Sequence, residues 1–270
     1  MTLDLTSVRA KLTRGQEHTQ AFKNEFLAWS NRYPYSLLKK KNLDCTRHSI
    51  FIRVNEVPPL QRWSLLIADA FNNLRNALDH LVFAIAAHEA ATDPPPFEGK
   101  LQFPIADCKD RFDGAVNERH YLGTISDPIR AAIELAQPYN SPHPTLPPLL
   151  SILRDFTNSD KHKLLHLALA SPIQGDVGFT GNLPPGAECV AVPFFGEVED
   201  NTEIFAMVCN RPTPEMDFDR HIFDVSVSIK HAKRDPLGGE WTGRTEFAAL
   251  YREVSKIVRG TIYDIVSKVK

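Results

Sequence analysis

Residues 60–89, LQRWSLLIADAFNNLRNALDHLVFAIAAHE, decide how this chain folds. They contain neither glycine nor proline and lie between Pro58-Pro59 and Pro94-Pro95-Pro96, so they can form one helix about 45 Å long. At 100° per residue, apolar side chains gather on one face, which predicts contact with a hydrophobic core. This apolar face comprises Trp63, Ile67, Ala70, Leu74, Ala77, Leu78, Leu81 and Ile85.

The opposite face of this helix is polar but contains neither lysine nor glutamate. This polar face comprises Asp69, Asn72, Asn73, Arg75, Asn76, Asp79 and His80. Lysine and glutamate normally fill a solvated helix face, whereas asparagine and aspartate compete with the helix by bonding to backbone groups. Leu65 and Phe83 lie at the same angle, above and below the middle of the polar face. We therefore expect another helix or another subunit to cover it at least in part.

The segments around this helix predict an α+β protein. A helical bundle is expected from residues 1–170, joined by the C-terminal helix 246–270, with a β-rich antiparallel insert at residues 171–245 between them. Periodicity predicts helices at residues 5–29, 107–118, 127–136 and 149–162, the third capped by Asp127. Alternation predicts strands at residues 46–54, 188–195, 202–210 and 221–230, and a turn at residues 39–42.

Composition limits the function classes. The chain has 270 residues, with 31 basic and 33 acidic side chains and a formal charge of −2. These values are typical of a folded globular protein and exclude a disordered or collagen-like chain. They argue against a surface that binds nucleic acid as a whole, because non-specific phosphate binding depends on excess Lys and Arg. Any site for phosphate would be local.

Compartment is inferred from signals that the sequence lacks. The N-terminal residues show no apolar signal-peptide core, and the run Leu81–Ala87 is too short to cross a bilayer, so we expect no membrane association. Cys45, Cys108, Cys189 and Cys209 form no C-x-x-C pair. Free thiols and a cytoplasmic location are therefore expected.

One hexapeptide on the polar face indicates a family. Arg75-Asn76-Ala77-Leu78-Asp79-His80 has an arginine followed directly by asparagine, with a histidine after four intervening residues. In this it resembles the HEPN superfamily, all-helical domains of which many members are metal-independent ribonucleases. The motif here comes early in the chain and a β-rich region is added, which departs from the compact HEPN bundle.

The resemblance implies a metal-independent endoribonuclease, such as a toxin or an antiviral defence effector, that needs no cofactor and no metal. Histidine titrates near neutrality, so His80 can transfer a proton to or from the reacting RNA. Arg75 offers a permanent bidentate charge for the phosphate, and Asn76 can position His80 or the phosphate. One histidine is few for two proton transfers, so a homodimer that pairs two polar faces is expected to complete the site.

A second resemblance, to a group of uncharacterised bacterial proteins, covers most of residues 60–165. In that group a segment like 74–81 is followed by Phe103-Pro104-Ile105, Gln137-Pro138-Tyr139 and Asp160-Lys161-His162. It implies no function by itself. The residues expected to bind substrate or to assist at the site are Asn72, Asp79, Asp160, Lys161 and His162.

Other interpretations stay open at this point. Asp79 can neutralise Arg75, which would make the polar face a structural element of a non-catalytic helical module for dimerisation or partner binding. Asp79 and His80 can instead join Asp160 and His162 in a metal or small-molecule site. Basic residues between Lys39 and Arg53 form either an RNA-binding surface or a solvated loop and strand edge.

Overall fold

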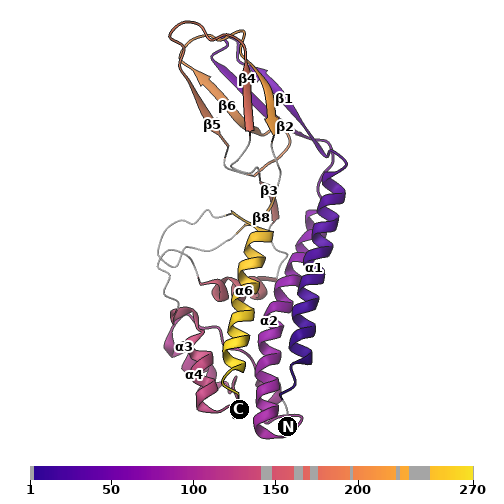
Figure 1. Ribbon diagram of the computed structural model, residues 1–270, viewed down its shortest axis with the longest axis vertical. Coiled ribbons are helices and arrows are strands. Elements are labelled where there is room, and N and C mark those ends of the chain that lie inside the picture. Colours follow the sequence, from indigo (N-terminus) through magenta and orange to yellow (C-terminus); the bar gives the residue numbers. More distant parts are fainter. Residues whose placement is uncertain are drawn as a thin grey trace. The chain divides into compact units, whose positions relative to one another are not determined.

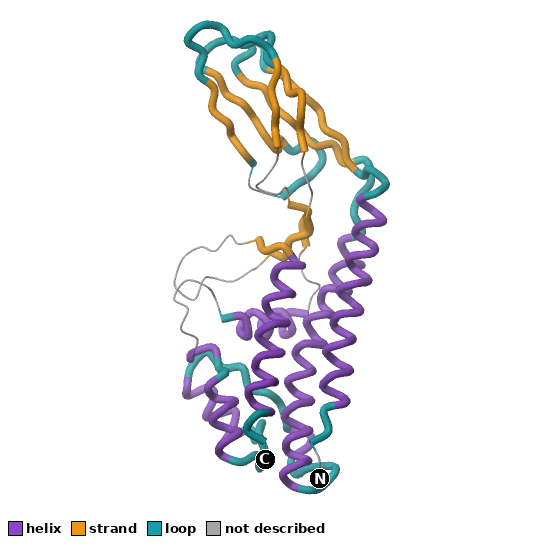
Figure 2. Tube along the Cα trace, in the orientation of Figure 1, coloured by secondary structure: helices purple, strands orange, loops and turns teal. Residues whose placement is uncertain are grey.

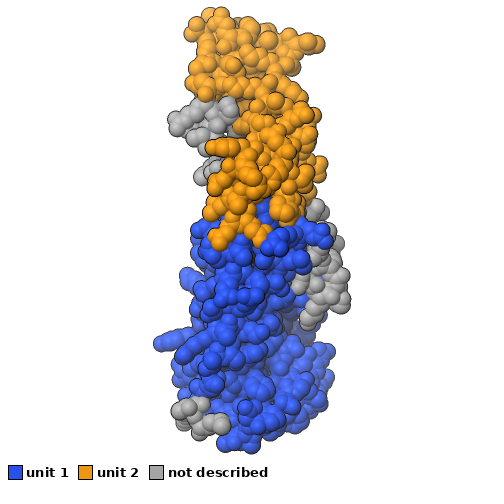
Figure 3. All heavy atoms as spheres, turned by 90° about the vertical axis from the view of Figure 1, so that its right-hand side faces the viewer, with its two compact units in different colours: residues 1–23, 61–165, 231–270 blue, residues 24–60, 166–230 orange. Residues whose placement is uncertain are grey.

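The computed structural model describes residues 3–140, 148–160, 167–170, 176–194, 197–222, 226–230 and 244–269. The chain divides into two compact units, coloured separately in Figure 3. The first, which we call the helical unit, comprises residues 1–23, 61–165 and 231–270. The second, the β unit, comprises residues 24–60 and 166–230. The expected α+β class is confirmed, whereas the division differs from the expected one because residues 24–60 belong to the β unit.

Three long helices run beside one another in the helical unit (Figure 1). They are α1 (Thr6–Ser30), α2 (Leu60–Ala90) and α6 (Phe247–Val266). The shorter helices are α3 (Lys109–Asp113), the π-helical turn η2 (Gly114–Glu118), α4 (Asp127–Leu135) and α5 (Leu149–Asp160), with single 3₁₀ turns at Glu98–Lys100 and Pro138–Asn140. The helix predicted at residues 107–118 is thus present in two pieces. Among the described residues, no helix is long and apolar enough to cross a membrane.

The predicted apolar face of α2 forms the core of this unit. All eight of its residues are fully buried. Aromatic rings join the helices across it: Phe22 of α1 lies 5.7 Å from Trp63 of α2 and 5.0 Å from Phe247 of α6, between ring centroids. Phe71 of α2 lies 5.1 Å from Phe156 of α5. Each such side chain contributes roughly 1.5–3 kcal/mol through burial, so tertiary packing rather than helix propensity holds these helices in place.

Gly15 lies within α1, where a glycine is unfavourable for the helix. A Cβ at residue 15 would lie 2.8 Å from the hydroxyl of Tyr251 and 3.1 Å from the carbonyl oxygen of Ala70. Glycine costs about 1 kcal/mol in a helix relative to alanine. Here its missing side chain lets α1 approach both α2 and α6.

The start of α4 corrects the predicted cap by one residue. The N-cap is Ser126, and Asp127 is the first helical residue. Glu89, at the end of α2, accepts hydrogen bonds from the backbone N–H of Ser126 at 2.7 Å and from its hydroxyl. A carboxylate at a helix N-terminus satisfies free N–H groups and favours the helix dipole, so Glu89 ties α4 to α2.

The β unit is built around a four-stranded antiparallel sheet (Figure 2). Its order is β1 (Tyr35–Lys41), β2 (Arg47–Val54), β6 (Glu203–Cys209) and β5 (Cys189–Pro193). β4 (Asp176–Thr180) pairs with β7 (Asp217–Ile222), β3 (Leu167–Ala170) pairs with β8 (Ser226–Lys230), and β9 (Arg244–Glu246) precedes α6. Ile50 and Ile52 of β2 and Ile204 of β6 are buried under the sheet.

Two expectations about the strands were wrong. The turn predicted at residues 39–42 is occupied by β1, which extends to Lys41, and the chain reverses at residues 42–46. The insert is antiparallel as predicted, but its strands β5 and β6 do not form a separate sheet, because β6 pairs with β2 as well as with β5. A hairpin from the first sixty residues therefore completes the sheet that the later strands begin.

The expectation of four free thiols was also wrong. Cys189 and Cys209 lie opposite each other on β5 and β6 and form a disulfide. Cys45 and Cys108 are free. Residues that are twenty apart in sequence become direct neighbours only when the two strands pair, which spacing alone does not reveal.

Candidate functional site

The polar face of α2 is half-buried, apart from exposed Asp69. Partial cover is thus present as expected, but the part that residues 102–106 provide is a segment without helix, where another helix or another subunit was expected. Arg75 Nη2 donates to the carbonyl oxygen of Phe103 at 2.6 Å and lies 3.1 Å from Asp79 Oδ1. Asp79 Oδ1 in turn accepts from the Phe103 N–H at 2.8 Å. Arg75 and Asp79 thus bind the C=O and the N–H of Phe103, and these two bonds fix the 102–106 segment on α2.

Burial leaves part of Arg75 without a hydrogen bond. Its side chain is only 11% exposed, and its Nη1 atom is buried with no hydrogen-bond partner in the part of the chain that the structure describes. Burial lowers the pKa of this guanidinium, and the charge of Asp79 opposes that effect. Arginine stays charged in proteins. An unsatisfied N–H of a buried cation costs about 1–3 kcal/mol or more, so this atom is an open donor for an anion.

Arg75 lines a polar cavity of about 860 Å³ in the helical unit. We call it the arginine cavity, because α3, the η2–Tyr121 segment and α5 each add an arginine to its wall. The lining arginines are Arg75, Arg111, Arg119 and Arg154. The lining acids are Asp79, Asp110, Glu118 and Asp155, and the other polar lining residues are Asn72, Asn76, Gln102, Tyr121, Thr157 and Asn158. The wall contains four arginines and four acidic residues, so these charges cancel. The position of each charge therefore decides what the cavity can bind.

Arg154 is the second cation that the fold holds in place. It donates to Asp107 Oδ2 at 2.6 Å and to Asp155 Oδ1 at 2.9 Å. Burial disfavours its charge, but the hydrogen bonds that it donates to the carboxylates of Asp107 and Asp155 raise its pKa above the usual value. Ser151 donates to Asp107 at 2.8 Å. Arg154 is therefore already neutralised, in contrast to Arg75.

Arg111 and Arg119 are exposed. Arg111 lies 3.5 Å from the carboxylate of Asp107, and the guanidinium of Arg119 lies 6.0 Å from the centre of the Tyr121 ring. Such exposed contacts contribute little to stability. Both side chains are free to reorient toward a ligand at the cavity.

The structure separates the two residues of the R-x4-H motif. Asn72, Arg75, Asn76 and Asp79 line the arginine cavity, but His80 does not. The pKa of His80 is lowered, first by burial and then by the charge of Lys11 on α1, while Asp79 opposes the shift. The imidazole is thus neutral at neutral pH, which is the form that accepts a proton.

The second predicted cluster lies outside the described residues. Lys161 and His162 lie outside the described residues, as does the side chain of Asp160, whose backbone ends α5. The neighbouring residues of α5 do reach the cavity: Arg154, Asp155, Thr157 and Asn158 all line it. Among the described residues, no group of three or more His, Cys, Asp or Glu side chains has the arrangement of a metal site.

The basic segment between Lys39 and Arg53 is largely engaged within the β unit. Lys39 donates to the carbonyl oxygen of Phe218, Lys41 donates to that of Pro214 at 2.9 Å, and Arg47 forms an ion pair with Glu203. Lys40 lies 4.3 Å above the Phe51 ring. These contacts favour the solvated-edge interpretation of this segment over an RNA surface.

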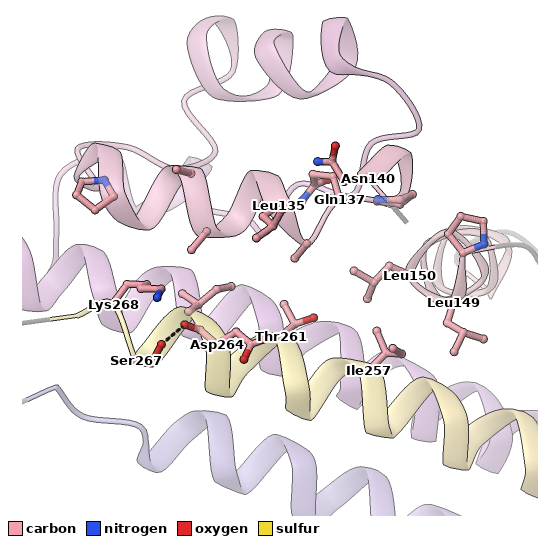
Figure 4. A pocket seen from close by; sticks show the side chains of 17 residues that line it. Leu135, Gln137, Asn140, Leu149, Leu150, Ile257, Thr261, Asp264, Ser267 and Lys268 are labelled. Carbon is pink, nitrogen blue, oxygen red and sulfur yellow. Dashed lines mark hydrogen bonds between the residues drawn. The ribbon is translucent and has the colours of Figure 1, made fainter. Parts of the chain in front are cut away.

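A second cavity, of about 830 Å³, lies between α4 and α6 (Figure 4). Its wall is mainly apolar, and Leu135 and Ile257 are 75% and 42% exposed within it. The polar end contains Asp264 and Lys268. Sequence patterns predicted the C-terminal helix but not this opening, because the opening depends on where α4 lies.

Comparison of the chain with family models, with curated proteins and with solved structures finds no match. The HEPN interpretation therefore stays a prediction from the motif. Sequence patterns identified four residues of the arginine cavity and missed the arginines of α3, η2 and α5. Their only signal was the i, i+4 spacing of Asp107 and Arg111, which is common on any solvated helix.

Proposed function

We propose that this protein binds a phosphate group of RNA in the arginine cavity, with Arg75 as the principal contact. The observation that carries the proposal is Arg75, whose side chain lines this cavity and whose buried Nη1 atom has no hydrogen-bond partner among the described residues. A phosphate oxygen is a strong acceptor for a guanidinium N–H. It would satisfy this donor, and the two exposed arginines at the cavity would add long-range attraction.

RNA is the proposed ligand because of the R-x4-H motif, and cleavage is the activity that the HEPN resemblance implies. Arg75 would stabilise the charge that builds on phosphorus as the 2′ oxygen attacks it and its bond to the 5′ oxygen breaks. The neutral imidazole of His80 would accept the ribose 2′-OH proton and return it to the leaving 5′ oxygen. His80 does not line the cavity of its own chain. A cleavage site that uses both residues therefore requires a second copy of the chain to supply His80, which makes a homodimer part of the proposed nuclease.

A second candidate rests on a different observation. Arg75 and Asp79 both bond to the backbone of Phe103, so the polar face already has a structural task. In this alternative the chain is a non-catalytic helical module, and its polar residues hold the 102–106 segment in place. The two candidates differ in whether the cavity takes an anion.

The test measures binding and cleavage of a short single-stranded RNA. The Arg75→Gln variant is expected to weaken binding at least about tenfold, because a charge-assisted contact contributes roughly 1.5–3 kcal/mol. Arg14→Gln is the matched control, since Arg14 is 61% exposed and pairs with Glu17. Circular dichroism and urea denaturation establish that each variant is folded.

His80→Ala separates binding from cleavage. The nuclease proposal expects cleavage by the wild type that EDTA does not inhibit, with cleavage lost and RNA binding kept in His80→Ala. Absence of RNA binding by the wild type at micromolar protein would refute the proposed function. Binding without cleavage would refute only the nuclease.

A further inference from the structure

Two stacked rings lie beside the arginine cavity, and nothing in the proposed phosphate contact uses them. The rings of Phe97 and His120 are parallel to within 19°, with centroids 5.0 Å apart. We call them the ring pair. The chain neighbours of His120, Arg119 and Tyr121, both line the cavity. The ring pair thus lies one residue away from the cavity wall.

Both residues of the ring pair have an unusual backbone. Phe97 has φ 63° and His120 has φ 57°, in the left-handed region that residues with a Cβ rarely adopt. Such conformations persist only where the surrounding structure imposes them, and they gather at ligand sites. Here the Gln102 N–H donates to the Tyr121 carbonyl at 2.9 Å, and the Gly123 N–H donates to that of His120 at 3.0 Å.

Gly123 makes room for this arrangement. It has φ 53°, and a Cβ there would lie 2.9 Å from the Leu101 side chain and 3.8 Å from the Phe97 ring. The segment that carries His120 is thus fixed next to the ring of Phe97. The rings are held in position by backbone contacts, so no large rearrangement is needed before a ligand meets them.

The Phe97 ring keeps an open surface although His120 stacks on it. Phe97 is 46% exposed, and an exposed aromatic ring is a favourable surface for a nucleobase, which offers a π-face whatever its identity. Single-stranded RNA is recognised through unstacked bases that lie on aromatic side chains beside a basic groove. The ring pair provides the aromatic surface, and Arg75, Arg111 and Arg119 provide cations at the neighbouring cavity.

We propose that the ring pair stacks a base of single-stranded RNA next to the phosphate bound at Arg75. This rests on the proposed function and adds a substrate class to it, namely unpaired strands. A base in a duplex is already stacked and cannot reach the ring, so double-stranded RNA gains nothing from this contact.

The experiment compares a labelled oligoadenylate with the same ribose-phosphate strand without bases, by fluorescence anisotropy. The wild type should bind oligoadenylate about 5- to 150-fold more tightly than the baseless strand, the range measured for one stacked base. Phe97→Leu should lose this preference and bind the baseless strand as the wild type does. Tyr263→Leu, at a ring that is 75% exposed on α6, is the control and should keep it.

Phe97→Trp provides a second readout if Phe97→Leu fails to fold, since it keeps a flat ring and should retain the preference. Equal binding of both strands by the wild type would overturn the inference and leave phosphate binding intact. A preference that persists in Phe97→Leu would overturn it as well. Binding of neither strand would instead refute the proposed function.

Discussion

Removing the charge of Asp79 should destabilise the helical unit by about 2–3 kcal/mol. Loss of one partner of a buried ion pair costs roughly 3–5 kcal/mol, because a buried charge is left unpaired, whereas exposed pairs contribute about 0–1 kcal/mol. Arg75 is 11% exposed and Asp79 is 28% exposed, which places the pair nearer the buried limit. Asn at residue 79 keeps an oxygen that can accept from the Phe103 N–H. The expected loss of about 2–3 kcal/mol is therefore smaller than the roughly 3–5 kcal/mol of a fully broken buried pair.

The assay is urea denaturation of Asp79→Asn followed by tryptophan fluorescence, for which fully buried Trp63 on the same helix is a reporter. Asp69→Asn is the matched control. Asp69 is 55% exposed, and its carboxylate is 3.9 Å from the His18 imidazole, so we expect a change below about 0.5 kcal/mol. If both variants unfold at the same urea concentration, Arg75 and Asp79 do not hold the 102–106 segment and the structural reasoning is refuted.

Three further predictions concern the rest of the fold. Gly15→Ala should destabilise the protein by about 1–2 kcal/mol, because overpacking between helices exceeds the gain in helix propensity. Gly260 has open space around it, so Gly260→Ala should stabilise the protein by roughly 0.5–1 kcal/mol. Stabilisation by both substitutions would contradict the close approach of α1 to α2 and α6 at Gly15. Burial lowers the pKa of His48, so as the pH falls the unfolded chain takes up a proton at this residue before the folded chain does. Stability should therefore fall as the pH drops below about 6.5. Urea titrations at several pH values should show a smaller fall for His48→Gln. Reduction of the disulfide Cys189–Cys209 should destabilise the β unit by about 3 kcal/mol. Urea denaturation in dithiothreitol should then show a lower midpoint than in its absence, and an unchanged midpoint would contradict that disulfide.

Local patterns predicted the helices well, because each depends on periodicity and on nearby caps. The apolar face of α2 is buried as predicted. Long-range pairing could not be predicted in this way. The contact of β2 with β6 joins residues more than 150 positions apart, and the disulfide follows from strand pairing that spacing does not encode.

The candidate site was predicted in part, for the same physical reason. The polar face of α2 stood out because asparagine and aspartate are unfavourable in helices, and four of its residues line the arginine cavity. The rest of the cavity comes from residues 102–106, from the segment that runs from α3 to Tyr121 and from α5, whose placement depends on tertiary packing. Arg75 and His80 differ by about 140° around the helix axis, so Arg75 lines the cavity and contacts Phe103 while His80 does not line it.

The central claim, that Arg75 binds a phosphate in the arginine cavity, is tested most directly by the salt dependence of binding to a short single-stranded RNA. Each phosphate contact contributes about 0.7 to the slope of log affinity against log salt. The account predicts that Arg75→Gln lowers this slope by about one contact and weakens binding at least about tenfold, while Arg14→Gln changes neither. An unchanged slope and affinity in a folded Arg75→Gln protein would contradict it.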